Sequence, residues 1–287
     1  MNSAAEGNAM DDMQAIGISK EAEGRIVDAH CHIYPGAIAE RAAAAIGRFY
    51  DVPMLFDGQV ETLLGEGAQA GISRFVVSSV ATKPHQVQAV NTFIASQVSA
   101  HPNRLAGLGT LHPDSPDMEG DIALLKSLGL KGVKVHPDML GIPIDDPRFM
   151  RMFALCEGQL PVLCHFGDKR FDLTNPNRTA TVLKAFPRLT IIGAHLGGWS
   201  VWREAAEALS QYKNLLTDCS SSLFALPPQE AASLIRRYGA ERVLFGTDYP
   251  MWRAEEELAR FAMLPLSEPE RQAILWVNAT RLYGICW

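Results

Sequence analysis

The sequence predicts an α/β protein built as a single-domain (β/α)8 barrel of the TIM type, and three observations support this fold class. Short apolar, β-branched segments alternate eight times with longer segments of helical periodicity. No linker or break in composition divides them. The glycine-rich phosphate-binding loops that would favour a doubly wound open sheet are absent from the sequence. Because alternating strands and helices produce parallel strands, eight such units favour a closed barrel.

Each predicted strand is a short apolar segment. The eight segments are Arg25–Tyr34, Ile72–Val80, Leu105–Leu111, Leu130–Pro137, Pro161–Gly167, Leu189–Gly197, Asn214–Ser221 and Val243–Pro250. Helical patterns lie between them, for example Gln59–Gly71, His85–His101, Met118–Gly129, Pro147–Gly158, Trp202–Tyr212 and Gln229–Gly239, and Glu268–Tyr283 follows the last strand. Boundary residues support these helices, since Asp146-Pro147 is typical of a helix start and Gly71 and Gly129 are typical of helix ends.

Two segments lie outside this alternation. Pro35–Gly58 is longer than most strand-to-helix connections, so we expect it to cover the mouth of the barrel. Met1–Gly24 is polar, acidic and rich in glycine and alanine, and it lacks the basic and apolar regions of a signal peptide. We therefore expect residues 1–24 to form a flexible arm, residues 25–287 to form the barrel, and the protein to be cytoplasmic.

The composition argues against several classes of function. The chain of 287 residues carries a net charge of −6 and has no run of lysine or arginine, which argues against binding to nucleic acid or to an anionic membrane. No apolar stretch approaches the roughly 18 residues that span a bilayer. The five cysteines include no C-x-x-C pair, so neither a zinc ribbon nor a disulfide framework is predicted. A small-molecule substrate is the expected partner, and assembly into a homo-oligomer stays open.

Polar residues recur at the carboxyl-terminal ends of the predicted strands. In (β/α)8 barrels, active sites lie at this end of the strands. In the first strand, a period of two places Asp28, His30 and His32 on one face. Val27, Ala29 and Cys31 lie on the other face, which we expect to meet the helices. Both histidines then point into the barrel, where they can reach one metal ion. Asp28 lies two residues deeper than the first histidine, and we interpret it as structural.

The same pattern ends four further strands. His165, His195 and Asp248 each follow an apolar run, and Lys134 and His136 share parity on the fourth strand. A charged or imidazole side chain is costly to bury unless it is paired or bound to a metal. Each residue alone has an ordinary structural alternative, such as a hydrogen-bonded core histidine or a capping aspartate. Together, at one end of the barrel, they predict a site.

These motifs, taken in order, resemble the amidohydrolase superfamily, and more narrowly its amidohydrolase 2 branch of metal-dependent hydrolases. That branch also contains aminocarboxymuconate-semialdehyde decarboxylase and related non-oxidative decarboxylases. The resemblance runs from about Arg25 to Tyr283. The motifs that carry it are Asp28-Ala29-His30-Cys31-His32, Gly132-Val133-Lys134-Val135-His136-Pro137, Cys164-His165, Ala194-His195-Leu196-Gly197-Gly198 and Phe245-Gly246-Thr247-Asp248-Tyr249-Pro250.

The resemblance implies a role for each residue. The implied metal ligands are His30, His32, His165 and Asp248. The implied catalytic groups are Asp248, His195 and Lys134, with His195 as an alternative ligand. In binuclear members a carboxylated lysine on the fourth strand bridges two metals, and whether Lys134 does so is left open, as is the number of ions. Imidazole and carboxylate ligands suit Zn²⁺, without excluding manganese, iron or nickel.

The favoured function is that of a hydrolase acting on an amide, ester or lactone bond of a small molecule. The metal would activate a water molecule, and Asp248 would carry its proton to the leaving group. His195 and Lys134 would stabilise the developing oxyanion. A barrel that binds metal without catalysis is a third interpretation, and the presence of both Asp248 and His195 argues against it.

The alternative enzymatic function is non-oxidative decarboxylation of a small unsaturated or aromatic carboxylic acid. The same ligands would then orient the acid, and its carboxylate would need a cation near the mouth. The candidates for that cation are Arg170, Arg178 and Arg253. His136 and Trp252 are further candidates for substrate binding.

Overall fold

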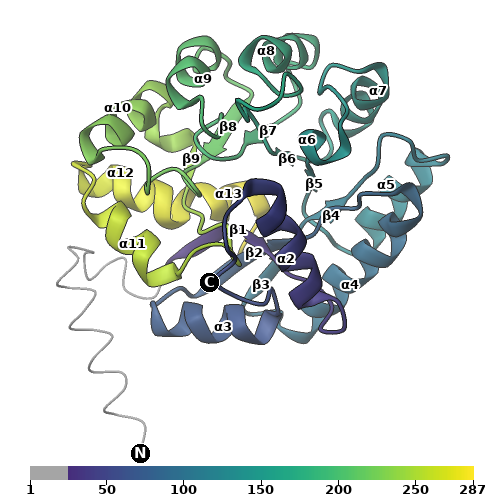
Figure 1. The fold of residues 1–287 in the computed structure, drawn as a ribbon, viewed down its shortest axis with the longest axis horizontal. Helices are drawn as coiled ribbons and strands as arrows, with labels where there is room; N and C mark the ends of the chain where they lie inside the picture. The colour runs from purple at the N-terminus through teal and green to yellow at the C-terminus, as the bar shows by residue number, and fades with distance from the viewer. Residues whose placement is uncertain (1–24) are drawn as a thin grey trace, which may run out of the picture.

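The computed structural model describes residues 25–287, and these form the barrel that the sequence predicts. Its strands are β1 (Val27–His32), β2 (Arg74–Ser78), β3 (Leu105–Gly107), β4 (Gly109–Thr110), β5 (Val133–Val135), β6 (Val162–Cys164), β7 (Ile191–Gly193), β8 (Leu215–Asp218) and β9 (Val243–Leu244). Neighbouring strands are parallel, in the orders β1-β2-β3 and β4-β5-β6-β7-β8-β9. Figure 1 shows the strands at the centre of a ring of helices. The expected arm, residues 1–24, lies outside the described residues.

Two seams join these sheets into one closed barrel. The amide of Leu108, between β3 and β4, donates to a β2 carbonyl at 2.9 Å, so β3 and β4 act as a single barrel strand. At the other seam, the amide of His32 donates to the carbonyl of Tyr249 at 2.7 Å. Across the same seam, the carboxylate of Asp28 accepts hydrogen bonds from the amide and hydroxyl of Thr247 at 3.0 and 2.6 Å. Asp28 therefore holds the barrel closed, in keeping with a structural role.

The first strand departs from the predicted alternation. Its register against β2 shifts between Asp28 and Cys31. Val27 and Ala29 consequently pack inside the barrel, in an apolar cluster with residues of β6 and β7. The prediction that these two residues meet the helices was wrong, because one local irregularity displaces the period of two. The two histidines that follow the shift point inward as predicted.

Helices surround the barrel and follow the predicted pattern. They are α2 (Ala39–Tyr50), α3 (Val60–Gln69), α4 (Val87–Ala100), α5 (Met118–Ser127), α6 (Pro137–Leu140), α7 (Pro147–Cys156), α8 (Pro176–Ala185), α9 (Trp202–Leu209), α10 (Pro228–Tyr238), α11 (Ala254–Ala262), α12 (Glu268–Gln272) and α13 (Asn278–Tyr283). A π-helical turn, Ala273–Val277, joins α12 to α13. Within it, the carbonyl of Ile274 accepts a hydrogen bond from the amide of Phe245 at 2.9 Å, which ties this turn to the chain just after β9.

The interior of the barrel is apolar towards the amino-terminal ends of its strands. The strands contribute one buried layer there, and α13 closes it with Ala279 and Tyr283. A larger apolar cluster fills the space between the strands and the surrounding helices. The polar residues described below therefore gather at the opposite, carboxyl-terminal end of the strands.

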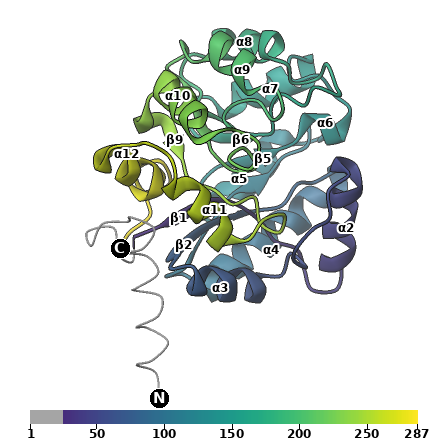
Figure 2. The same cartoon turned by 60° about the vertical axis from the view of Figure 1, so that its left-hand side comes forward.

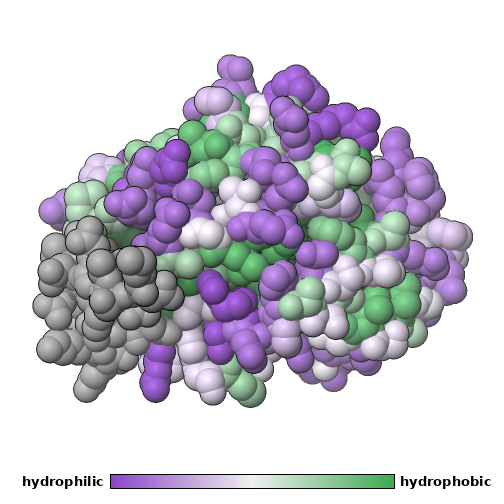
Figure 3. Space-filling model, turned by 90° about the horizontal axis from the view of Figure 1, so that it is seen from below, coloured by the Kyte–Doolittle hydropathy of each residue, from purple (hydrophilic) through white to green (hydrophobic). Residues whose placement is uncertain are grey.

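The outer surface mixes residue types. Figure 2 shows α2 and α4 on the same side of the barrel, and Figure 3 shows a face on which hydrophilic and hydrophobic residues are interspersed. Within residues 25–287, none of the helices has both the length and the apolar character needed to cross a membrane.

Candidate metal centre and active site

Two side chains from β1 and one from the chain that follows β9 converge at the mouth of the barrel. His30 Nε2 and His32 Nε2 are 3.2 Å apart, and they lie 3.5 and 3.4 Å from Asp248 Oδ1. Donor atoms that bind one ion at about 2.0–2.2 Å lie roughly 3.0–3.5 Å from one another. The spacing and chemistry of this group therefore fit a single divalent metal ion.

Hydrogen bonds fix which nitrogen of each histidine faces the group. His30 Nδ1 lies 3.0 Å from the Asp218 carboxylate, which can only accept a hydrogen bond, so the ring proton belongs on Nδ1. His32 Nδ1 lies 3.4 Å from the hydroxyl of Ser78. Burial opposes ionisation of Asp218, but the neighbouring His30 outweighs it and holds the pKa of this carboxyl below its usual range. With its proton on Nδ1, His30 presents Nε2 to the group as an acceptor, which is the form that can bind an ion.

Asp218 is a residue that the sequence analysis missed. It ends β8 after an apolar run, which is the signal that identified the other site residues. Its carboxylate also accepts hydrogen bonds from the His195 and Ser220 amides, both at 3.1 Å. Asp218 therefore orients two predicted site histidines.

His195 is placed by an unusual backbone conformation. Its φ of 62° lies in the left-handed region, which turns the side chain into the site after the apolar end of β7. His195 Nδ1 lies 3.1 Å from the carbonyl of Ser220, which can only accept, so Nε2 is left as an acceptor. That nitrogen suits a proton acceptor or a ligand better than the oxyanion donor expected from the sequence.

His165 lies next to His195 and apart from the group of three. Its Nδ1 is 3.1 Å from His195 Nε2, and its ring stacks on His136 with centroids 4.1 Å apart. Among the described residues, it joins no set of three donors within 4.8 Å of one another. The role of His165 as a metal ligand stays a prediction.

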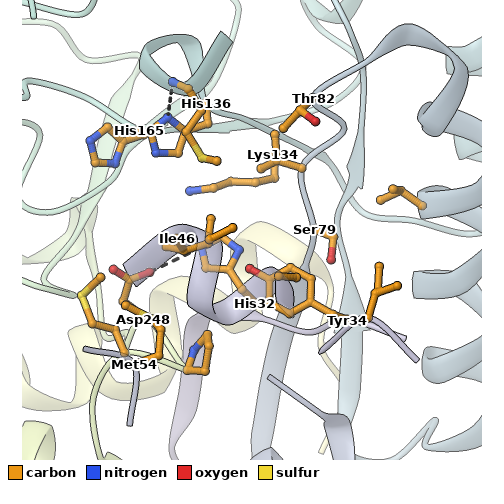
Figure 4. Close-up of a pocket in the computed structure, with 18 of the residues that line it drawn as sticks. His32, Tyr34, Ile46, Met54, Ser79, Thr82, Lys134, His136, His165 and Asp248 are labelled. Carbon is orange, nitrogen blue, oxygen red and sulfur yellow. Dashed lines mark hydrogen bonds and ion pairs between the residues drawn. The ribbon is translucent and has the colours of Figure 1, made fainter. Parts of the chain in front are cut away.

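The Lys134 side chain extends between the donor group of His30, His32 and Asp248 and the stacked pair of His165 and His136. Figure 4 shows its side chain lying between His136 and His165 on one side and His32 and Asp248 on the other. Its Nζ lies 3.0 Å from His30 Nε2. The lysine is fully buried, and this burial lowers its pKa from the usual value. Lys134 therefore places its buried amine at the centre of the site.

A cavity of about 410 Å³ opens from these polar groups. The segment Pro35–Gly58, expected to cover the mouth, forms one wall of the cavity through α2. At the end of α2, the hydroxyl of Tyr50 lies 2.6 Å from His136 Nε2 and 3.2 Å from His165 Nδ1. Both His136 and Tyr50 line the cavity, and Tyr50 is a site residue for which the sequence pattern gave no signal.

The predicted cationic substrate contacts need correction. Among the described residues, Arg170, Arg178 and Arg253 do not line the cavity, and each is paired with a carboxylate elsewhere. Arg170 binds Asp168 at 2.6 Å and the carbonyl of Phe49, while stacking on the aromatic rings at the end of α2. The partners of the other two arginines are Asp145 and Asp172 for Arg178, and Glu66 for Arg253.

Trp252 also lies outside the cavity lining, and it acts on the site through a serine. Its indole nitrogen donates to Ser221 Oγ at 2.9 Å. That hydroxyl in turn donates to Asp248 Oδ2 at 2.6 Å. The chain of hydrogen bonds holds one carboxylate oxygen and leaves Oδ1 facing the two histidines.

With this geometry established, comparison with known proteins identifies the family. The amidohydrolase family model matches residues 27–285. The chain belongs to the amidohydrolase family. Membership of this family supports the use of a divalent metal ion and of a small-molecule substrate. The donor group of His30, His32 and Asp248 also supports the use of a metal ion.

Solved structures show the same fold at low identity. A 5-carboxyvanillate decarboxylase from Sphingomonas paucimobilis is 20% identical with a TM-score of 0.71, and the match covers 91% of this chain and 99% of that chain. A dihydroxybenzoic acid decarboxylase from a Polaromonas species, with bound manganese and an inhibitor, is 18% identical (TM-score 0.67; 91% and 97% covered). A probable 2-pyrone-4,6-dicarboxylic acid hydrolase from Acinetobacter baumannii is 17% identical (TM-score 0.66; 91% and 99% covered). Both decarboxylases and hydrolases thus share this barrel.

Replacing Asp218 by asparagine should weaken metal binding by about 10- to 100-fold. The NH2 group of the asparagine can face His30 Nδ1 and donate a hydrogen bond to it. The imidazole proton then moves to Nε2, which is the nitrogen that should bind the ion. Metal titration of the purified variant measures the effect, with Asp114→Asn, an exposed carboxylate paired with Arg148, as the control. Unchanged metal affinity in a folded Asp218→Asn protein would show that His30 needs no such orientation.

Proposed function

We propose that this protein is a metal-dependent hydrolase of an amide, ester or lactone bond in a small molecule. The observation that carries the proposal is the placement of Asp248. One of its oxygens faces the two histidine donors, and the other is held by Ser221. Burial opposes its ionisation, but His30 and His195 outweigh this and hold the pKa of Asp248 below its usual range, so the carboxylate is charged.

The residues divide the chemistry between them. A divalent ion, Zn²⁺ by its fit to nitrogen and oxygen ligands, would polarise the substrate carbonyl and make a water molecule more acidic. Asp248 accepts the proton of the attacking water and passes it to the leaving oxygen or nitrogen as the bond from the carbonyl carbon breaks. Lys134 stabilises the negative charge that develops on the carbonyl oxygen. The products are a carboxylic acid and an alcohol or amine.

The cavity favours hydrolysis over decarboxylation. A decarboxylase would need a cation for the substrate carboxylate, and the three arginines predicted for that purpose are paired outside the cavity. Lys134 is the only lysine or arginine among the described residues that line the cavity, and it contacts His30 at 3.0 Å. Decarboxylation is the second candidate, supported by the membership of such enzymes in the same barrel family.

A single screen separates the two reactions. The metal-loaded protein is incubated with lactones, esters and amides, and in parallel with unsaturated and aromatic carboxylic acids. Acid release from lactones and esters is followed by titration, amine release from amides by an amine assay, and CO₂ release by a coupled assay. We expect acid release that disappears with a chelator and returns with added metal. Metal-dependent CO₂ release without any hydrolysis would replace the proposed function by the second candidate.

A further inference from the structure

The cavity has one polar end and two apolar walls. One wall is a face of α2 and the residue before it, where side chains recur every three or four positions: Ile38, Ala42, Ala45 and Ile46. The facing wall is the corresponding face of α4: Ala89, Val90 and Phe93. Figure 4 shows Ile46 and Met54 beside the polar groups. Both walls therefore offer apolar surface to whatever enters.

Charge is confined to the polar end. Among the described residues that line the cavity, only Lys134 and Asp248 are ordinarily charged, and both face the metal donors. Two uncharged polar residues, Thr82 and Gln86, line the cavity just before α4, and Gln86 is the larger. Its amide oxygen already accepts hydrogen bonds from the amides of Thr82 and Lys83 at 2.9 and 3.0 Å. The walls thus hold no cation for an acidic group.

We propose that the substrate is uncharged and apolar away from its scissile bond, and that the α2 and α4 walls select it. This inference rests on the proposed hydrolase function, because in that function Lys134 interacts with the reacting carbonyl and is not free to bind a second acidic group. A carboxylate placed against the walls would lose its hydration without a compensating cation. An apolar ring would instead displace water from apolar surface. A cavity of about 410 Å³ is within the range of sites for small molecules.

Binding of two ketones tests the selection without requiring turnover. Benzylacetone and its para-carboxylated analogue have a carbonyl that cannot be hydrolysed, and they differ only in charge at the far end of the ring. Isothermal titration of the metal-loaded protein should show the neutral ketone binding at least about tenfold more tightly. Equal affinity, preference for the carboxylate, or binding of neither ketone would overturn the inference.

Two arginine variants test whether the wall formed by α2 selects between the neutral and the carboxylated ketone. Ala42→Arg adds a cation to the cavity wall and should shift the affinity ratio towards the carboxylated ketone by about tenfold. Ala44→Arg adds the same charge to the same helix at an exposed position outside the cavity lining, and it should keep the wild-type ratio. An equal shift in both variants would mean that general charge attraction, rather than the wall, sets the ratio, and would overturn the inference.

Turnover distinguishes this inference from the proposed function. Benzyl acetate and its para-carboxylated analogue are hydrolysable counterparts of the two ketones, with an oxygen in place of the CH2 group next to the carbonyl. Discrimination between the ketones without turnover of either ester supports the selective walls and counts against the hydrolase. Turnover of both esters at equal kcat/KM supports the hydrolase and overturns the selective walls.

Discussion

Replacing Asp248 by asparagine should lower kcat by about 10²- to 10⁴-fold while leaving the protein folded. The substitution keeps the shape of the side chain, so the hydrogen bond from Ser221 at 2.6 Å can persist. An amide carries no negative charge, however, and it cannot take up the proton of the attacking water. Steady-state kinetics on a substrate from the hydrolysis screen, together with metal analysis of the same preparation, measure the loss.

Three further variants make this result specific. Asp114→Asn removes an exposed carboxylate and should turn over substrate at the wild-type rate. His195→Asn should lose activity with a milder effect on metal content, and the double variant with Asp248→Asn should lose less than the product of the two single losses. Near-normal turnover by Asp248→Asn with metal bound would remove this carboxylate from the mechanism and leave a barrel that only binds metal.

The general position of the site could be predicted because barrel geometry is regular. Parallel strands end at one rim, so charged or imidazole residues that follow separate apolar runs must meet there. Lys134 illustrates this, since it lies on β5, far from β1 in sequence, yet its Nζ lies 3.0 Å from His30. Asp218 obeys the same rule and was within reach of sequence reasoning.

Exceptions to strand periodicity could not be predicted. The register shift in β1 turns Val27 and Ala29 inward, although the alternating pattern places them outside. His195 reaches the site through a φ of 62°, which costs about 1–3 kcal/mol and leaves no mark in the order of residue types. Such local departures depend on the surrounding packing, which fixes the backbone only once the barrel is closed.

The substrate contacts were the least predictable part of the site. Arg170 and Arg253 follow the expected strands, but nearby carboxylates, Asp168 and Glu66, neutralise them outside the cavity. Tyr50 enters the site from a helix in the covering segment, where no strand rule applies. Charge pairing and loop placement therefore decide the lining of the cavity, and neither follows from the barrel pattern.

Removing one histidine of the metal group should abolish most metal binding. We expect about one divalent ion per purified wild-type chain, because His30, His32 and Asp248 form one compact donor group, and each imidazole supplies a large share of its donors. His32→Ala is the preferred variant, since His30→Ala would also leave the buried Asp218 carboxylate without its imidazole partner. Elemental analysis after metal loading and gel filtration gives the occupancy.

The controls for this loss also decide the number of ions. His85→Ala removes an exposed histidine outside the cavity and should keep wild-type occupancy. Wild-type occupancy in both His30→Ala and His32→Ala would instead mean that these histidines are structural. Lys134→Ala should leave the single ion in place, because the uncarboxylated lysine is a cation beside the donor group rather than part of it. Two ions in the wild type and one in Lys134→Ala would show that the lysine is carboxylated and bridges them, since carboxylation gives that side chain two oxygen donors for two ions.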